Sequence, residues 1–224
     1  MRDEYAGDIG DFGKLALLRH LSKGRKLGEC WYKTSYPSKQ KNDGKHTSYL
    51  TDDRGELRCL DPPVFDALKK LIHNPPRCIA ALQRSGLLRD AIFHDAEVPI
   101  KDRSAWTEAM KAKVSNCDLI FLDPDNGIEG RRLTRKHVAL SEIIGLRQKN
   151  RVLVIYHHQG RRVARDEAQM LRLKVKNAGW SPVELIRFRL FSSRFYIIAG
   201  PDSVMRRSIQ EFAKRWGDRV EHFP

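Results

Sequence analysis

The chain has 224 residues, enough for an α/β domain with a substantial buried core, and no apolar stretch approaches the length of a membrane span. Its 42 Lys and Arg against 28 Asp and Glu give a formal net charge of +14, which favours a polyanionic partner, with nucleic acid as the leading candidate. The alternative is a basic protein whose charge is solvated on all sides. The amino terminus lacks the apolar core of a signal peptide, so we expect a cytoplasmic protein. Four widely spaced cysteines predict reduced thiols rather than a structural zinc site.

The first predicted element is a helix within residues 5–21, whose leucines fall on one side and whose start can be capped by Asp8 or Asp11. Gly7 is the first of three glycines that recur at every third position before and within this segment. No strand precedes these glycines, so they predict a close approach of the backbone to a ligand or to the sheet more than a phosphate-binding fingerprint.

The next part of the chain mixes strands and helices. We expect, in order, a strand at 28–36, a mobile polar loop at about 37–46, a helical segment at about 61–88 with its second helix at about 77–85, a short strand at 91–98 and a helix at 104–113. Asp61 precedes two prolines and is predicted to cap the first of these helices. Asp95 lies within the short strand.

The centre of the sequence is the stretch C-D-L-I-F-L-D-P-D-N-G-I-E-G, residues 117–130. Its apolar run at 119–122 is typical of a strand that is buried on both faces of a parallel sheet. Polar residues follow directly where the strand ends, and ligands of open α/β sheets bind outside the carboxyl ends of the strands. The first site candidates are therefore Asp123, Asp125, Asn126 and Glu129. The alternative is an ordinary turn with local hydrogen bonds, because Asp-Pro and Asn-Gly are common turn formers.

The carboxyl-terminal half has a regular pattern. It predicts a helix at 135–146, a strand at 151–156, a helix at 165–178, strands at 183–190 and 194–199, and a closing helix at about 203–216. The last two strands are separated by a tight turn, so they must be antiparallel neighbours. The fold class is therefore α/β, with a doubly wound, mostly parallel sheet and an antiparallel carboxyl-terminal strand pair, as in a Rossmann-like methyltransferase fold within a single domain.

Two motifs resemble a known family. The segment A-G-D-I-G-D-F-G-K is similar to the opening motif of the bacterial ribosomal RNA adenine-N6 methyltransferases of the RlmJ type, and L-I-F-L-D-P-D-N-G stands where that family has a strand followed by Asp-Pro-Pro-Tyr. The resemblance implies an S-adenosylmethionine-dependent methyltransferase of class I that acts on a nucleic-acid base, most simply at N6 of adenine. It also implies a methyl-donor site at Gly7, Asp8, Asp11, Lys14 and Asp95.

The second motif departs from the family pattern in two positions. Asp125 and Asn126 replace the second Pro and the Tyr, so the ring that stacks on the target base is absent. Asn126 could still accept a hydrogen bond from the base, and Tyr156 could stack in its place. No glycine-rich donor loop follows a first strand.

The resemblance assigns roles to the remaining polar residues. Asp123 would accept a hydrogen bond from the target amine and so position it, which requires no strong base. Residues from the next strand end and from two basic groups would hold the substrate: Tyr156, His157, His158, Arg131 and Arg161. The basic groups themselves are Arg131, Arg132, Arg135 and Lys136, then Arg161, Arg162 and Arg165.

Two other functions remain open on the sequence. Asp123, Asp125 and Glu129 have the hard oxygen ligands that bind Mg²⁺ or Mn²⁺, with His157 or His158 nearby, so a metal-dependent nuclease or phosphotransferase is one alternative. The other is a catalytically inactive methyltransferase fold that serves as a nucleic-acid-binding module, which the missing Tyr and the missing glycine loop favour.

Overall fold

The computed structural model describes residues 2–34, 46–51, 55–74 and 76–224. The chain divides into two compact units, where the sequence suggests a single domain. The first unit contains residues 24–34 and 90–224, and the second contains residues 2–23 and 35–89. The expected polar loop at 37–46 lies outside the described residues, apart from His46. No helix in the described ranges is long and apolar enough to cross a membrane.

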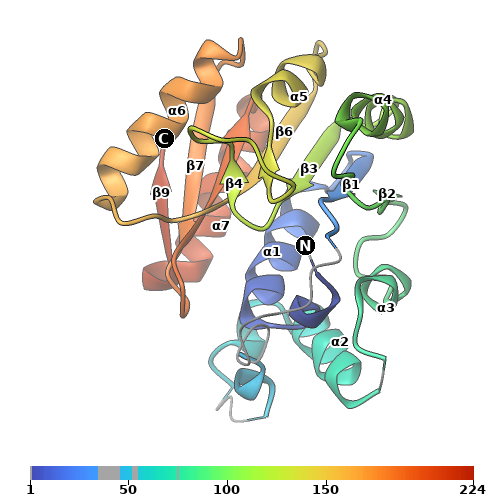
Figure 1. Cartoon of the computed structure of the whole chain (residues 1–224). Coiled ribbons are helices and arrows are strands. Elements are labelled where there is room, and N and C mark those ends of the chain that lie inside the picture. Colours follow the sequence, from blue (N-terminus) through green and yellow to red (C-terminus); the bar gives the residue numbers. More distant parts are fainter. Residues whose placement is uncertain (1, 35–45, 52–54, 75) are drawn as a thin grey trace. The chain divides into compact units, whose positions relative to one another are not determined.

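The first unit is built on a seven-stranded sheet with the order β2-β1-β3-β6-β8-β7-β9 (Figure 1). Its strands are β1 Leu27–Trp31, β2 Ile92–His94, β3 Leu119–Asp123, β6 Val152–His158, β7 Val183–Phe188, β8 Arg194–Ala199 and β9 Val220–Phe223. The pairs β1–β2, β1–β3 and β3–β6 are parallel, whereas β8 is antiparallel to both β6 and β7. The sheet is therefore mostly parallel, with one reversed strand inserted between β6 and β7 and a second reversed strand, β9, at the edge.

Helices cover both faces of this sheet. Three helices lie on one face: α4 Arg103–Lys113, α5 Leu140–Gly145 and α6 Ala164–Asn177 (Figure 1). Their apolar side chains pack against alternate strand residues in one continuous core. On the other face, α7 Ser203–Trp216 packs Phe212 and Trp216 against Phe188 of β7. Strand β3 is buried along its whole length, as its unbroken apolar run predicts.

The second unit is helical. It contains α1 Ile9–Leu21, α2 Pro62–His73 and α3 Ile79–Arg84, with short 3-10 turns at Asp3–Tyr5, Ser48–Leu50 and Arg58–Leu60. Phe12, Tyr49 and Phe65 pack their rings together at centroid distances of 5.8–6.1 Å. The predicted cap is confirmed, because the Asp61 carboxylate accepts a hydrogen bond from the Val64 N–H at the start of α2.

Several predicted boundaries are wrong, and long-range pairing explains most of the differences. The helix expected at 135–146 begins only at Leu140, since β5 His137–Val138 pairs with β4 Gly127–Ile128. The strand expected at 151–156 extends to His158 because β8 pairs with it from Leu153 to His158. The first two strands are shorter than expected: β1 ends at Trp31 and β2 spans only Ile92–His94. The strand at 194–199 and the helix at 203–216 are confirmed.

Candidate functional site

The strand order reverses between β1 and β3. The chain passes from β1 to β2 on one side of β1 and then returns through α4 to β3 on the other side. In open α/β sheets, ligands bind outside the carboxyl ends of the strands at this kind of reversal. Asp123 ends β3, Asp95 follows β2, and β6 ends with Tyr156, His157 and His158. Five of the predicted site residues therefore lie at the edge formed by the carboxyl ends of the parallel strands.

The acidic turn that follows β3 is fixed by three neighbouring segments. The carbonyl of Asp123 accepts a hydrogen bond from the Tyr32 N–H just after β1, at 3.3 Å. The Asn126 N–H donates to the Lys136 carbonyl at 2.9 Å, and the Asn126 carbonyl accepts from the His158 N–H at 3.1 Å. The side chain of Asp123 is buried, that of Asp125 is half-buried and that of Asn126 is exposed. The turn is therefore a preorganised part of the sheet edge. Its one amide side chain is exposed, and the Asn126 Nδ2 lies 3.4 Å from His137 Nε2.

Gly127 lies directly against His157. Its φ is +114°, and a Cβ built on it would lie 2.2 Å from His157 Nδ1, so no other residue fits here without movement. His157 Nδ1 also accepts a hydrogen bond from the Ile128 N–H at 3.1 Å. An accepting Nδ1 leaves the proton of the neutral ring on Nε2, which faces Glu167 Oε1 at 3.6 Å. His157 thus packs against Gly127 and binds the Ile128 N–H at the end of the acidic turn, whereas the resemblance predicts that it contacts the substrate.

The other two residues at the end of β6 differ from His157. His158 is exposed at its side chain, and partial burial and the nearby Arg194 guanidinium lower the pKa of its ring. Tyr156 is half-buried, and its ring packs edge-on against Tyr196 of β8 at 5.9 Å. Of the three, His158 is therefore the most open to a ligand.

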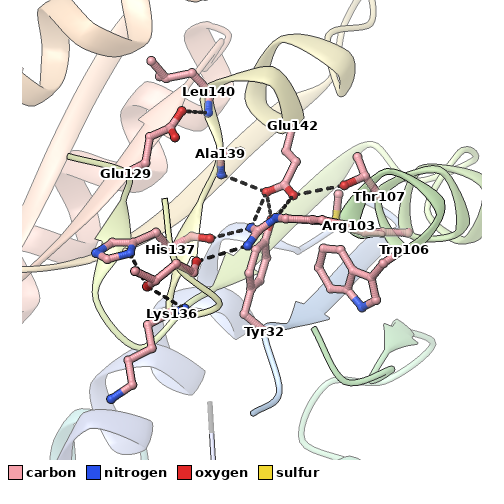
Figure 2. A network of polar contacts seen from close by, with 12 residues as sticks. Tyr32, Arg103, Trp106, Thr107, Glu129, Lys136, His137, Ala139, Leu140 and Glu142 are labelled. Atoms are coloured by element: carbon pink, nitrogen blue, oxygen red, sulfur yellow. Dashed lines mark hydrogen bonds and ion pairs between the residues drawn. The ribbon is translucent and has the colours of Figure 1, made fainter. Parts of the chain in front are cut away.

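The carboxylate of Glu129 is used within the fold. Its Oε1 accepts a hydrogen bond from the Leu140 N–H at the start of α5, at 2.7 Å (Figure 2). Lys174 of α6 also donates to the Glu129 carbonyl. Across the described residues, no group of three or more His, Cys, Asp and Glu is arranged to hold a metal ion. The geometry therefore does not support a metal site made of Asp123, Asp125 and Glu129.

A buried ion pair beside the turn is not apparent in the sequence. Glu142 of α5 is 1% exposed and accepts hydrogen bonds from Arg103 Nε at 2.7 Å, Tyr32 Oη at 2.9 Å and Thr107 Oγ1 at 3.0 Å (Figure 2). Arg103 also donates to the carbonyls of Thr134 and His137. Burial and the Glu142 carboxylate raise the pKa of Tyr32, which keeps its hydroxyl protonated and donating. This network joins the residue after β1, helices α4 and α5 and the 129–139 segment, and its only sequence signal is a Glu at the third position of a short helix.

The predicted basic groups are mostly available to a ligand. Arg131 and Arg132 are exposed in the loop between β4 and β5, and Arg161, Arg162 and Arg165 are exposed in and after the loop that follows β6. Arg135 differs because its guanidinium donates to the Val98 carbonyl and pairs with Glu97.

The remaining donor-site candidates lie in the second unit, at the start of α1. Asp8 caps this helix, with its Oδ1 accepting from the Gly10 N–H at 2.8 Å and the Asp11 N–H at 3.2 Å. Gly7 has a φ of +83° and donates its N–H to Asp11 Oδ2 at 2.8 Å. The predicted cap at Asp8 is confirmed. A Cβ built on Gly7 would meet Ile72 and Leu71 of α2 at 3.3 and 3.4 Å, so the close approach of its backbone is to this helix and not to the sheet.

Lys14 and Asp11 form a buried ion pair. Lys14 Nζ lies 2.6 Å from Asp11 Oδ1, and both side chains are less than 5% exposed. Burial raises the pKa of Asp11, and the ammonium of Lys14 opposes that rise. The pair is thus buried and belongs to the second unit, while Asp95 and Asp123 belong to the first unit.

The chain was compared with known proteins. A scan against protein-family models gives no match, and a search of curated proteins finds no significant similarity. The residues and the fold are therefore the basis for the functional conclusion.

Proposed function

We propose that the protein is an S-adenosylmethionine-dependent methyltransferase that acts on a nucleic-acid base, with N6 of adenine as the favoured position. The proposal rests on one observation. The buried Asp123 ends β3, which lies where the strand order reverses, and the carboxyl-terminal half of the same sheet contains the antiparallel strand β8. This agrees with the sheet and the Asp-Pro position that the family resemblance implies. The motif at α1 supports it less, because Lys14 is committed to Asp11.

The polar residues at the carboxyl ends of β1 and β2 suit the polar groups of a nucleoside-containing donor. An acidic residue after the second strand of a Rossmann-like sheet commonly binds the ribose hydroxyls, and Asp95 is exposed in this position. In the described part of the chain, Thr34 Oγ1 and His94 Nε2 are buried without a hydrogen-bond partner. Buried polar atoms are normally satisfied, so these two atoms favour a ligand that completes them. Burial also lowers the pKa of His94, which keeps its ring neutral.

The chemistry asks little of the protein beyond positioning. S-adenosylmethionine, when bound, supplies an electrophilic methyl group. The amine of the base must be desolvated and oriented. The buried Asp123 carboxylate can accept a hydrogen bond from one of its N–H groups. The exposed Arg131 and Arg161 would bind phosphates at the same edge, with an affinity that falls as salt rises.

The decisive experiment separates the donor site from the rest. Calorimetric titration with S-adenosylmethionine and with S-adenosylhomocysteine should give saturable binding to the wild-type protein, and Asp95→Asn should weaken it about tenfold or more, since a charge-assisted hydrogen bond to a hydroxyl is lost. Asp218→Asn, an exposed Asp near the carboxyl terminus, is the matched control and should bind as the wild type does. Lys14→Ala is a poor probe because it also removes a buried ion pair.

A second assay tests the reaction. Transfer of labelled methyl groups to total RNA or to genomic DNA should be lost in Asp123→Asn, while donor binding stays within a few-fold of the wild-type value. Absence of donor binding to folded protein, with and without nucleic acid, would overturn the proposal. Salt-sensitive nucleic-acid binding without donor binding would then identify an inactive binding module, and cleavage that depends on added Mg²⁺ or Mn²⁺ would identify a nuclease.

A further inference from the structure

Exposed apolar side chains gather in the loops at one edge of the sheet. Of the seven large apolar side chains that are exposed in the described residues, four lie in loops that follow the parallel strands. They are Ile100 after β2, Leu133 in the loop after β4, Val163 after β6 and Phe191 after β7, with exposed fractions of 80%, 44%, 70% and 63%. Each has an exposed basic residue one or two positions away, namely Lys101, Arg132, Arg162 and Arg189. Val204 of α7 also has an exposed basic neighbour, Arg206, so the four loops are distinguished by the edge that they share and not by this pairing.

The four loops belong to one surface of the first unit. Strands β2, β3, β6 and β7 run in the same direction, so their carboxyl ends share an edge. Hydrogen bonds also connect the loops in pairs. Arg103, which starts α4 just after Ile100, donates to the Thr134 carbonyl, and the Gln159 N–H donates to the Ser193 carbonyl at 3.2 Å. We name this surface, made by Ile100–Lys101, Arg131–Leu133, Arg161–Val163 and Arg189–Phe191, the loop edge.

Phe191 is the aromatic residue of the loop edge. It lies in the short turn between β7 and β8, where Phe188 and Arg194 are the last paired residues. Its φ is +58°, a conformation that is uncommon for a bulky residue and is often retained for function. The turn is also tied to β6, because Arg187 donates to Gln159 Oε1 at 2.6 Å and to Ser193 Oγ at 3.2 Å. An exposed ring is thus held on a short, anchored hairpin.

We propose that the loop edge binds single-stranded nucleic acid, with the ring of Phe191 stacking on a base and Arg161, Arg162 and Arg189 contacting phosphates. A base exposes its face only when it is not stacked in a duplex, so an exposed aromatic ring favours a single strand or a loop. The neighbouring arginines would contact the phosphates of that strand. Residues 159–165 and 189–193 contain no Asp or Glu to oppose an anionic strand. The inference rests on the proposed function, which gives nucleic acid as the partner. It adds that the bound nucleic acid is single-stranded and names the residues that recognise it.

Fluorescence anisotropy with labelled 20-nucleotide probes tests the surface without any donor. We expect the wild-type protein to bind single-stranded DNA or RNA at least tenfold more tightly than the same sequence as a duplex, with affinity falling steeply between 50 and 200 mM salt. Parallel titrations of oligo(dT) and oligo(U) show which backbone is preferred. Phe191→Ala should weaken single-strand binding roughly 5- to 100-fold, the range for loss of one stacked base. Phe191→Tyr should retain binding and Phe191→Leu should not.

Matched controls come from α7. This helix follows β8, which runs opposite to its neighbours, so α7 starts at the other edge of the sheet. Val204→Ala and Arg207→Ala remove an exposed apolar and an exposed basic side chain there, and both should bind as the wild type does. Arg161→Ala with Arg162→Ala should weaken binding and reduce its salt dependence.

The proposal is overturned by equal affinity for duplex and single strand, by a Phe191→Ala protein that binds normally, or by the absence of binding to every probe. Because the assay contains no S-adenosylmethionine, failure of the donor site leaves its result unaffected. Failure of the loop edge likewise leaves the calorimetric donor test intact.

Discussion

The start of α1 and the turn after β3 both place an Asp in the interior, but they hold it in different ways. Asp11 is held by Gly7 and Lys14, residues within four positions of it. The turn that begins at Asp123 is held by Tyr32, Lys136 and His158, which come from segments far away in the sequence. In the first arrangement the Asp11 carboxylate is neutralised by a local partner. In the second, the sheet assembles the turn at the edge where open α/β sheets generally bind ligands. The comparison indicates that the β3 turn is the better candidate for chemistry.

Removal of Lys14 should have the largest effect, because it breaks the local arrangement. Lys14→Ala leaves the Asp11 carboxylate buried without its cation, which should lower the free energy of unfolding by about 3–5 kcal/mol. Urea denaturation followed by circular dichroism measures the loss. Lys23→Ala, an exposed lysine of the same unit, should change stability by less than about 0.5 kcal/mol.

A double variant sharpens this prediction. Replacing Asp11 by Asn as well as Lys14 by Met removes both charges, so much of the loss should be recovered. If the double variant is no more stable than Lys14→Ala, the pair does not act as a neutralised unit, and a role for Lys14 outside the pair would have to be reconsidered.

Gly127→Ala should have a somewhat smaller effect on the sheet-assembled turn. The positive φ costs an L-residue roughly 1–2 kcal/mol, and the new Cβ must displace His157, so we expect a total loss of about 2–4 kcal/mol. Thermal unfolding measures it. Gly130→Ala, three residues later, has open space around its Cβ and should be close to neutral. Similar effects at both glycines would contradict the support that His157 gives the turn.

Glu167 should show the smallest effect, and it depends on pH. Burial raises the pKa of its carboxyl, but the nearby His157 ring and the hydrogen bond from the Gly160 N–H outweigh burial, so the pKa lies below its usual 4.5. The ionised group therefore stabilises the folded state above pH 4.5, and this contribution is lost as the pH falls through the folded-state value.

Glu167→Gln should accordingly be less stable than the wild type at pH 7 by roughly 1 kcal/mol, and the difference should shrink towards pH 3. Urea midpoints at pH 7, 5, 4 and 3 measure it. Asp166→Asn, the exposed neighbour, is the control and should give a constant small difference. A difference that grows on acidification would show that the sign is wrong.

The sequence predicts the local features of this protein well. The apolar run of β3, the cap at Asp61 and the closing helix at 203–216 all depend on residues close together in the chain, and each is confirmed. The antiparallel pairing of β7 and β8 follows from their short connection. Lys14 stands three residues after Asp11, which is within pairing distance on a helix, although its burial is not visible in the pattern.

The long-range features could not be predicted from the sequence. The two-residue strand β5 forms only because β4 lies beside it, whereas the local pattern at 135–146 predicts one helix. The sequence does not distinguish His157 from His158. In the structure His157 packs against Gly127 and holds the turn, whereas His158 is exposed. Glu129 has an acidic neighbourhood in the sequence, yet its partner is the start of α5.

The reversed direction of β8 has a consequence for how this fold can vary. A parallel strand in its place would have to be reached through a long crossover connection, whereas β7 and β8 are joined by a short hairpin at the loop edge. Surface hairpins accept insertions and substitutions without altering the strands that they join. Related chains could therefore exchange the Arg189–Ser193 tip for longer or differently charged ones, and so acquire new recognition properties while the turn after β3 and the core stay unchanged.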